Sequence, residues 1–279
     1  MRSNNPVFRR GFPRSDSYTR FGTGGAAAAT DPYGYGGSYG HGGGNPYTIT
    51  SQQTDQASAA GHMTMDDVIA RTTMTLGTVV IGSLLAWFVL PVTSTSYGIA
   101  IGAGLVAMLL GVAQSFKRTP SPILIIAYAA FEGVFLGVIS RMYNEAWQGA
   151  PVQAMLGTAA VLSGLLLAYK TRVIRVTQRY LRIGTAVAIG FLLLTAVNLL
   201  FAPFGGGLVL SGGLGIFVGI IGVLLGAFFL SLDFKRIEDG IQYGAPRDES
   251  WLAAFGLTMS LVWIYLEMVR LITLLRRDD

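Results

Sequence analysis

The sequence predicts an all-α integral membrane protein in which seven transmembrane helices follow a disordered N-terminal tail. Composition is the first reason: 52% of the 279 residues are hydrophobic and 13% are charged, about half the charged share of a soluble domain. The second reason is seven apolar segments, each near the ~20 residues that a helix needs to cross a bilayer. The third is a change of composition at about residue 62, before which apolar periodicity is absent.

Residues 1–62 are predicted to be a disordered cytoplasmic tail. The stretch GTGGAAAATDPYGYGGSYGHGGGNPY is rich in Gly, Tyr, Ala and Pro, and such a segment buries too little apolar surface to offset the entropy lost on ordering. A solvated extension is the simpler interpretation, and a docking or weakly self-associating segment is the alternative. The isolated His41 and His62 are interpreted as bystanders rather than ligands.

Residues 63–279 are predicted to form the transmembrane domain. Every backbone polar group in hydrocarbon needs an internal partner, so each apolar segment is expected to be a helix. Glycine-rich runs such as GIAIGAGL and GGLGIFVGIIGVLLG favour close packing of these helices. The predicted spans are residues 72–92, 98–116, 123–142, 152–169, 183–202, 208–232 and 251–275.

The basic residues predict the orientation. Most lie in the tail, near the start of the first span, and in the connections after the second, fourth and sixth spans, whereas Arg141, Arg276 and Arg277 fall on the other side. Cytoplasmic loops carry the excess of Lys and Arg, so the N-terminus is predicted to be cytoplasmic and the C-terminus to lie outside. This distribution differs from a nucleic-acid-binding surface. The stretch YKTRVIRVTQRYLRIG is also a candidate contact for anionic membrane lipids.

Three acids lie in or at the edge of the spans: Glu132, Asp233 and Glu267. A charge at mid-bilayer costs about 2.5–3.5 kcal/mol, so such residues are functional candidates. Glu132 lies near the middle of the third span with no local cation. Asp233 is either functional or part of an interfacial turn, LDFKRIED, in which it forms local pairs. Glu267 has Arg270 on the same helical face, and this ion pair must face protein or water, which places the seventh span inside the bundle.

Four sequence features resemble the Bax inhibitor-1 family, also called the transmembrane Bax inhibitor motif family, in its prokaryotic branch. They are AAFEGVFLGVIS, SLDFKRIEDG, IYLEMVRL and the closing DD, in this order. The resemblance implies a central seventh helix wrapped by the other six and, together with the lack of an organelle-targeting signal, a bacterial plasma membrane. No cofactor is expected. The resemblance also implies a pH-sensitive calcium leak in which a carboxylate of the sixth helix and one of the seventh share a proton or a hydrogen bond.

The resemblance assigns the sixth-helix acid to Asp233 and the seventh-helix acid to Glu267, and makes both the expected contacts of Ca²⁺. The second acid is usually Asp in the family, and Glu keeps the charge while adding one methylene. A basic residue after the second span, which the family can use to contact the sixth-helix acid, corresponds to Lys117 or Arg118.

Counting along a simple hairpin does not bring Asp233 and Glu267 together. If the turn centres on YGAP, their heights differ by roughly 14 Å at 1.5 Å per residue. An asymmetric turn or a tilted helix would close this gap, and a pair of Glu132 with Glu267 remains the alternative.

Either pair predicts a pH-gated cation path, because two close carboxylates titrate as a unit and, when ionised, attract a hard divalent cation. Ca²⁺ is the ion that the resemblance implies; the residues do not distinguish it from protons or Na⁺. The alternative is a membrane interaction protein that binds or restrains a membrane partner such as a protease. An enzyme is not expected, since the sequence holds no GxGD segment, P-loop or zinc-binding spacing.

Overall fold

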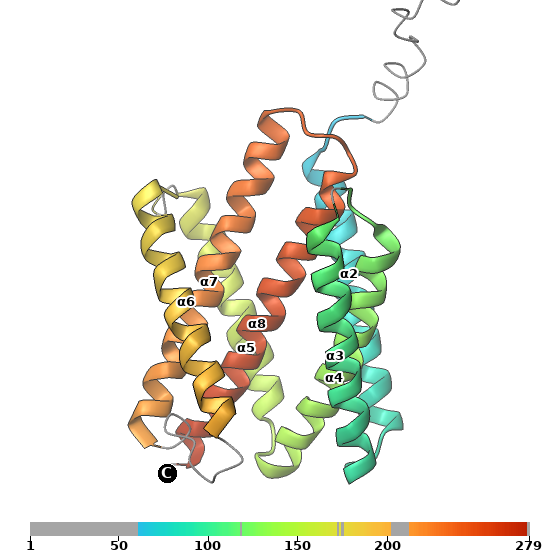
Figure 1. Ribbon diagram of the computed structural model, residues 1–279, viewed down its shortest axis with the longest axis vertical. Coiled ribbons are helices and arrows are strands. Elements are labelled where there is room, and N and C mark those ends of the chain that lie inside the picture. The colour runs from blue at the N-terminus through green and yellow to red at the C-terminus, as the bar shows by residue number, and fades with distance from the viewer. Residues whose placement is uncertain (1–60, 118, 172, 174–175, 202–211, 278–279) are drawn as a thin grey trace, which may run out of the picture. The chain divides into compact units, whose positions relative to one another are not determined.

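The computed structural model describes residues 61–117, 119–171, 173, 176–201 and 212–277. Within these ranges it contains seven helices that are long and apolar enough to cross a membrane, which confirms the predicted fold class (Figure 1). The predicted tail up to residue 60, Arg118 and the predicted start of the sixth span at 208–211 lie outside the described residues. The helices are α2 (Met65–Val89), α3 (Ser94–Phe116), α4 (Pro122–Ala146), α5 (Ala150–Lys170), α6 (Gln178–Phe201), α7 (Gly212–Gln242) and α8 (Glu249–Arg277).

The helix ends follow local sequence signals. Thr64 precedes α2 and its side chain accepts a hydrogen bond from the Asp67 backbone N–H, while Pro122 occupies the first turn of α4. Gly149, with φ 79°, supplies the left-handed residue before α5. We call the end of the bundle where α2 begins the Met65 end; it also carries the α7–α8 connection (Figure 1).

Helix α7 continues ten residues beyond the predicted span end at residue 232. Lys235 supports this extension, since its Nζ lies 2.7 Å from Asp239 Oδ1 and 3.5 Å from Glu238 Oε2, at helical spacings of four and three. Asp233 therefore lies well inside a helix, two and a half turns from its end.

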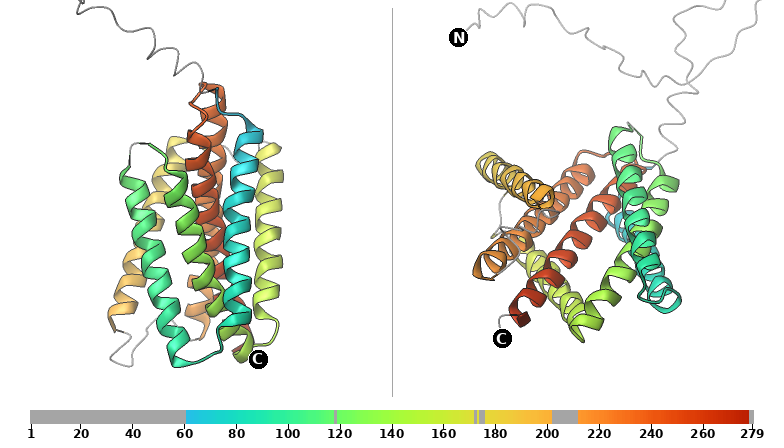
Figure 2. Two further views of the ribbon diagram at one scale, coloured as in Figure 1. Left: turned by 90° about the vertical axis from the view of Figure 1, so that its right-hand side faces the viewer. Right: turned by 60° about the horizontal axis from the view of Figure 1, so that its bottom comes forward.

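Helix α8 lies at the centre of the bundle, as predicted (Figure 2). Its backbone packs against α2, α4, α5 and α7. Phe255 of α8 reaches a cluster that includes Ala107 of α3, and the Trp263 ring lies 5.8 Å from the Phe191 ring of α6. All six other helices thus contact α8.

Small residues allow helices α2 and α4 to touch backbone to backbone. A Cβ atom added at Gly133 would lie 2.5 Å from the Val79 carbonyl oxygen, and one at Gly137 would lie 2.3 Å from that of Ser83. Large apolar side chains such as Phe88 and Ile101 are instead exposed on the outside. This distribution is what a bilayer requires, because lipid tails are as apolar as the side chains that face them.

Candidate functional site: buried carboxylates along the central helix

Asp233 is a buried carboxylate that α7 directs toward α8. The Ser260 hydroxyl donates a hydrogen bond to Asp233 Oδ2 over 2.6 Å. The other oxygen lies against Gly256, where an added Cβ would be 2.8 Å from Asp233 Oδ1. Gly256 therefore leaves the space that the carboxylate occupies, and Ser260, one turn later on α8, supplies its hydrogen-bond donor.

Two cavities meet at Asp233. One, of about 510 Å³, lies between α7, α8 and the end of α3 at Ser115. The other, of about 430 Å³, extends toward the Met65 end, where Met63 and Pro246 line it. Asp233 and Arg236 line both cavities. The carboxylate thus stands between a cavity along the α7–α8 interface and a cavity toward the Met65 end, with a cation on the same helix.

Glu267 occupies a second position, farther along α8. Its carboxylate lies against Gly222 of α7, where an added Cβ would be 2.6 Å from Oε2. Arg270 Nη1 lies 3.3 Å from Glu267 Oε2, and the Trp263 indole N–H donates to the Gly222 carbonyl over 3.0 Å. Arg270 Nε finds no hydrogen-bond partner among the described residues. The second position is therefore a largely buried ion pair of α8 that lies against α7.

The structure does not bring Asp233 and Glu267 together. Asp233 lies eleven residues after Gly222, the α7 residue opposite Glu267, and Glu267 lies seven residues after Ser260. At 1.5 Å per residue, the two carboxylates are separated by about 10–16 Å along the helix axes. Each has a separate set of neighbours, and no shared proton links them in this conformation.

Glu132 of α4 is buried and makes no hydrogen bond or ion pair with the described residues. Two contacts between α4 and α8 show where Glu132 lies along the length of α8. The Tyr128 ring packs edge-on against Phe255, and Ser140 shares a 2.7 Å hydrogen bond with Tyr265. Glu132 therefore lies level with residues 258–260 of α8. This is the level of Asp233, about two turns of α8 away from Glu267.

Asp233 makes no ion pair with a described basic residue after the second span. Lys117 follows the end of α3, is exposed, and makes no ion pair with a described residue, while Arg118 lies outside the described ranges. Arg236 is instead the cation that lines both cavities with Asp233. The spacing of three residues between Asp233 and Arg236 is the sequence signal for this arrangement.

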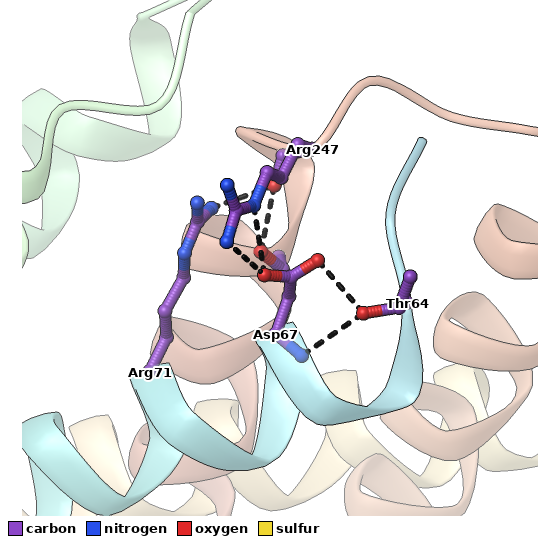
Figure 3. A network of polar contacts seen from close by, with 5 residues as sticks. Thr64, Asp67, Arg71 and Arg247 are labelled. Atoms are coloured by element: carbon purple, nitrogen blue, oxygen red, sulfur yellow. Dashed lines mark hydrogen bonds and ion pairs between the residues drawn. The ribbon is translucent and has the colours of Figure 1, made fainter. Parts of the chain in front are cut away.

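A polar network at the Met65 end joins the start of α2 to the α7–α8 connection (Figure 3). Arg247 of the α7–α8 connection donates to Asp67 Oδ1 over 2.8 Å, and Arg71 Nη1 donates to the Arg247 carbonyl over 2.6 Å. Backbone hydrogen bonds join Met63 to Ala245 and Arg247 to Gly61. This contact between residues 61–67 and the α7–α8 connection has no signal in the sequence that we could identify.

In the ranges that the structure describes, no three His, Cys, Asp or Glu side chains gather as metal ligands would. Asp233 and Glu267, the expected contacts of Ca²⁺, lie in separate environments. The two acids therefore do not form a joint set of the 6–8 oxygen ligands that Ca²⁺ requires.

Seven apolar helices around a central helix with buried carboxylates define a multi-pass membrane protein. The chain belongs to the family described as Bax inhibitor 1 like, whose sequence model matches residues 25–277. This match confirms the resemblance seen in the sequence. A comparison with curated proteins finds no match.

Proposed function

We propose that this protein is a pH-sensitive cation leak of the bacterial plasma membrane, with Ca²⁺ as the expected cargo and the Met65 end in the cytoplasm. The observation that carries the proposal is Asp233, a carboxylate placed between two cavities at the α7–α8 interface. A carboxylate inside a membrane bundle costs free energy, and charged residues of this kind mark ion pathways.

The interface between the two acidic positions supplies the barrier of the closed state. Ile264 is fully buried there, and a Cβ added at Gly226 would lie 2.4 Å from Ile264 Cγ1 and 2.9 Å from Trp263 Cδ1. A cation that reaches Asp233 must pass this packed layer to reach Glu267. Conduction therefore requires α7 and α8 to separate near Gly226.

Titration of Asp233 couples this barrier to pH. Ionised Asp233 attracts water and a cation into the adjoining cavities, and a hard divalent cation prefers such oxygen ligands. A proton on Asp233 removes the attraction and leaves the α7–α8 interface closed. Glu132, at the same level of α8, and Glu267, beyond the barrier, extend the acidic path.

Calcium uptake by proteoliposomes tests the proposal across about pH 5–8, where buried carboxyls titrate. We expect Asp233→Asn to lower the uptake and to flatten its pH profile. Glu267→Gln and Glu132→Gln report separately on the other two acids. Glu145→Gln is the matched control, because Glu145 is an exposed acid 3.7 Å from Arg141 at the opposite end of the bundle. Parental uptake by both Asp233→Asn and Glu267→Gln would contradict the proposal.

A regulatory membrane protein that binds a partner is the second candidate. The observation in its favour is that the segment leading into α2 is bonded to the α7–α8 connection, beside the cavity at Asp233. A partner that binds the N-terminal residues would act directly on this connection. Deletion of residues 1–60 separates the two candidates, since a leak should keep its flux whereas a docking function should lose partner association.

A further inference from the structure

A separate cavity of about 940 Å³ lies near the Met65 end, between α2, α5, α7 and α8. Its volume falls within the range of about 300–1,000 Å³ that is typical of small-molecule sites. The walls are largely apolar and include Val68 and Leu76 of α2, Leu166 of α5, and Phe234 and Ile237 of α7. Asp233 does not line it, because Phe234 and Ile237 lie on another face of α7.

The cavity opens on the side of the bundle that faces lipid. Ile69 and Leu166, which line it, are 56% and 47% exposed, although both belong to apolar helices that span the membrane. Ile69 lies four residues after the start of α2 and Leu166 four residues before the end of α5, so the opening is at the level where lipid acyl chains meet their headgroups, and an acyl chain is the apolar group that meets it.

The rim of the cavity is polar and lies where the helices end. Tyr169, at the end of α5, donates a hydrogen bond to Glu238 of α7, and Gln242 follows one turn later. Lys235 Nζ lies 2.7 Å from Asp239 and 3.5 Å from Glu238, so two carboxylates share one ammonium group. This side of the rim carries a net negative charge, while the exposed Lys170 adjoins Tyr169.

We propose that this cavity binds an aminophospholipid, with an acyl chain along the apolar walls and the primary ammonium at Glu238. The occupant must be amphipathic, because an apolar cavity ends in a polar rim at the helix ends. The ammonium complements Glu238 and Asp239, and Lys170 is available to the lipid phosphate. A purely anionic headgroup would face the two carboxylates without a compensating positive charge of its own.

Native mass spectrometry of the full chain, released from nanodiscs of defined lipids, tests this proposal independently of ion flux. The probes are phosphatidylethanolamine, phosphatidylcholine, whose ammonium donates no hydrogen bond, and phosphatidylglycerol, which carries no ammonium. We expect the parent to retain phosphatidylethanolamine in preference to the other two. Glu238→Gln should weaken that retention about tenfold, as expected for loss of a charge-assisted hydrogen bond.

Leu76→Trp fills the cavity and should abolish retention of every lipid there, and Leu166→Trp at the open side provides a second filling variant if the first fails to fold. The controls are Glu145→Gln, an acid-to-amide change at the other end, and Ile101→Trp, on an exposed face of α3. Equal retention of the three lipids by the parent, or unchanged retention in the filled variants, would overturn the proposal. A change of oligomeric state with unchanged lipid retention would assign the cavity to a second copy of the chain and overturn it too.

Discussion

Ser260 donates a 2.6 Å hydrogen bond to Asp233 and so joins the central helix to the acid of α7. Both side chains are buried, at 7% and 8% exposure. Such a hydrogen bond stabilises a protein by about 0.5–1.5 kcal/mol between neutral groups and about 1.5–3 kcal/mol to a charged group, and more is lost when one partner stays buried alone. This contact holds α7 against α8 next to the packed layer at Gly226.

Ser260→Ala should therefore loosen the α7–α8 interface. We expect the free energy of unfolding to fall by about 1–3 kcal/mol, because Asp233 keeps its burial and loses its donor. Calcium uptake by proteoliposomes should rise for the same reason. Ser260→Thr keeps the hydroxyl and should restore uptake to the parental rate; a Thr variant that leaks as much as the Ala variant would show that the hydrogen bond is not responsible.

Ile264→Ala tests the barrier between the two acidic positions. The change removes a fully buried side chain that faces Gly226, and it should cost about 2–5 kcal/mol of stability and leave a void. If this layer is the closed barrier, uptake should rise above the parent at every pH. Ile101→Ala, on an exposed face of α3, is the matched control and should leave uptake unchanged. Parental uptake in Ile264→Ala would place the barrier elsewhere.

Gly137→Ala tests the contact between α2 and α4 that supports the bundle. The added methyl would lie 2.3 Å from the Ser83 carbonyl and 2.8 Å from Ala86 Cβ, so the backbones must move apart. We expect a loss of about 1–3 kcal/mol in unfolding free energy. At Gly102 an added Cβ meets nothing within 4 Å, so Gly102→Ala should be neutral or stabilising by up to about 1 kcal/mol. Equal stabilities would contradict the close packing.

Sequence reasoning could predict the helices, because span length depends on the thickness of hydrocarbon and the apolar runs are long. The sixth span is predicted to end at residue 232, because charged residues begin there. The helix continues because those charges pair within it, at Lys235, Glu238 and Asp239. Local pairing of this kind makes a charged segment a stable helix beyond the membrane core.

Partners on other helices were harder to predict. Gly256 and Ser260 carry no sign in the sequence that Asp233 fills the space between them, because that depends on how α7 and α8 pack. The sequence leaves Glu132 open as a partner of Glu267. The structure places it with Ser260, since α4 and α8 begin at the same end and Tyr128 meets Phe255 six residues into each helix. Residues at equal distances from the starts of α4 and α8 therefore lie at the same level of the bundle.

The network at the Met65 end gives a final prediction. Arg247 donates to Asp67, and the amides of Met63 and Arg247 are bonded across the same contact (Figure 3). Arg247→Gln should open this contact, so both amides should exchange with deuterium faster than in the parent. The effect should shrink at high salt, because Arg247 is largely exposed and its ion pair is already screened there.

Arg276→Gln, which removes a hydrogen bond to Gln148 at the opposite end, is the control and should leave the exchange of the two amides unchanged. If calcium uptake rises together with exchange in Arg247→Gln, the segment leading into α2 restrains the α7–α8 connection, whereas faster exchange with parental uptake would limit this network to a structural role.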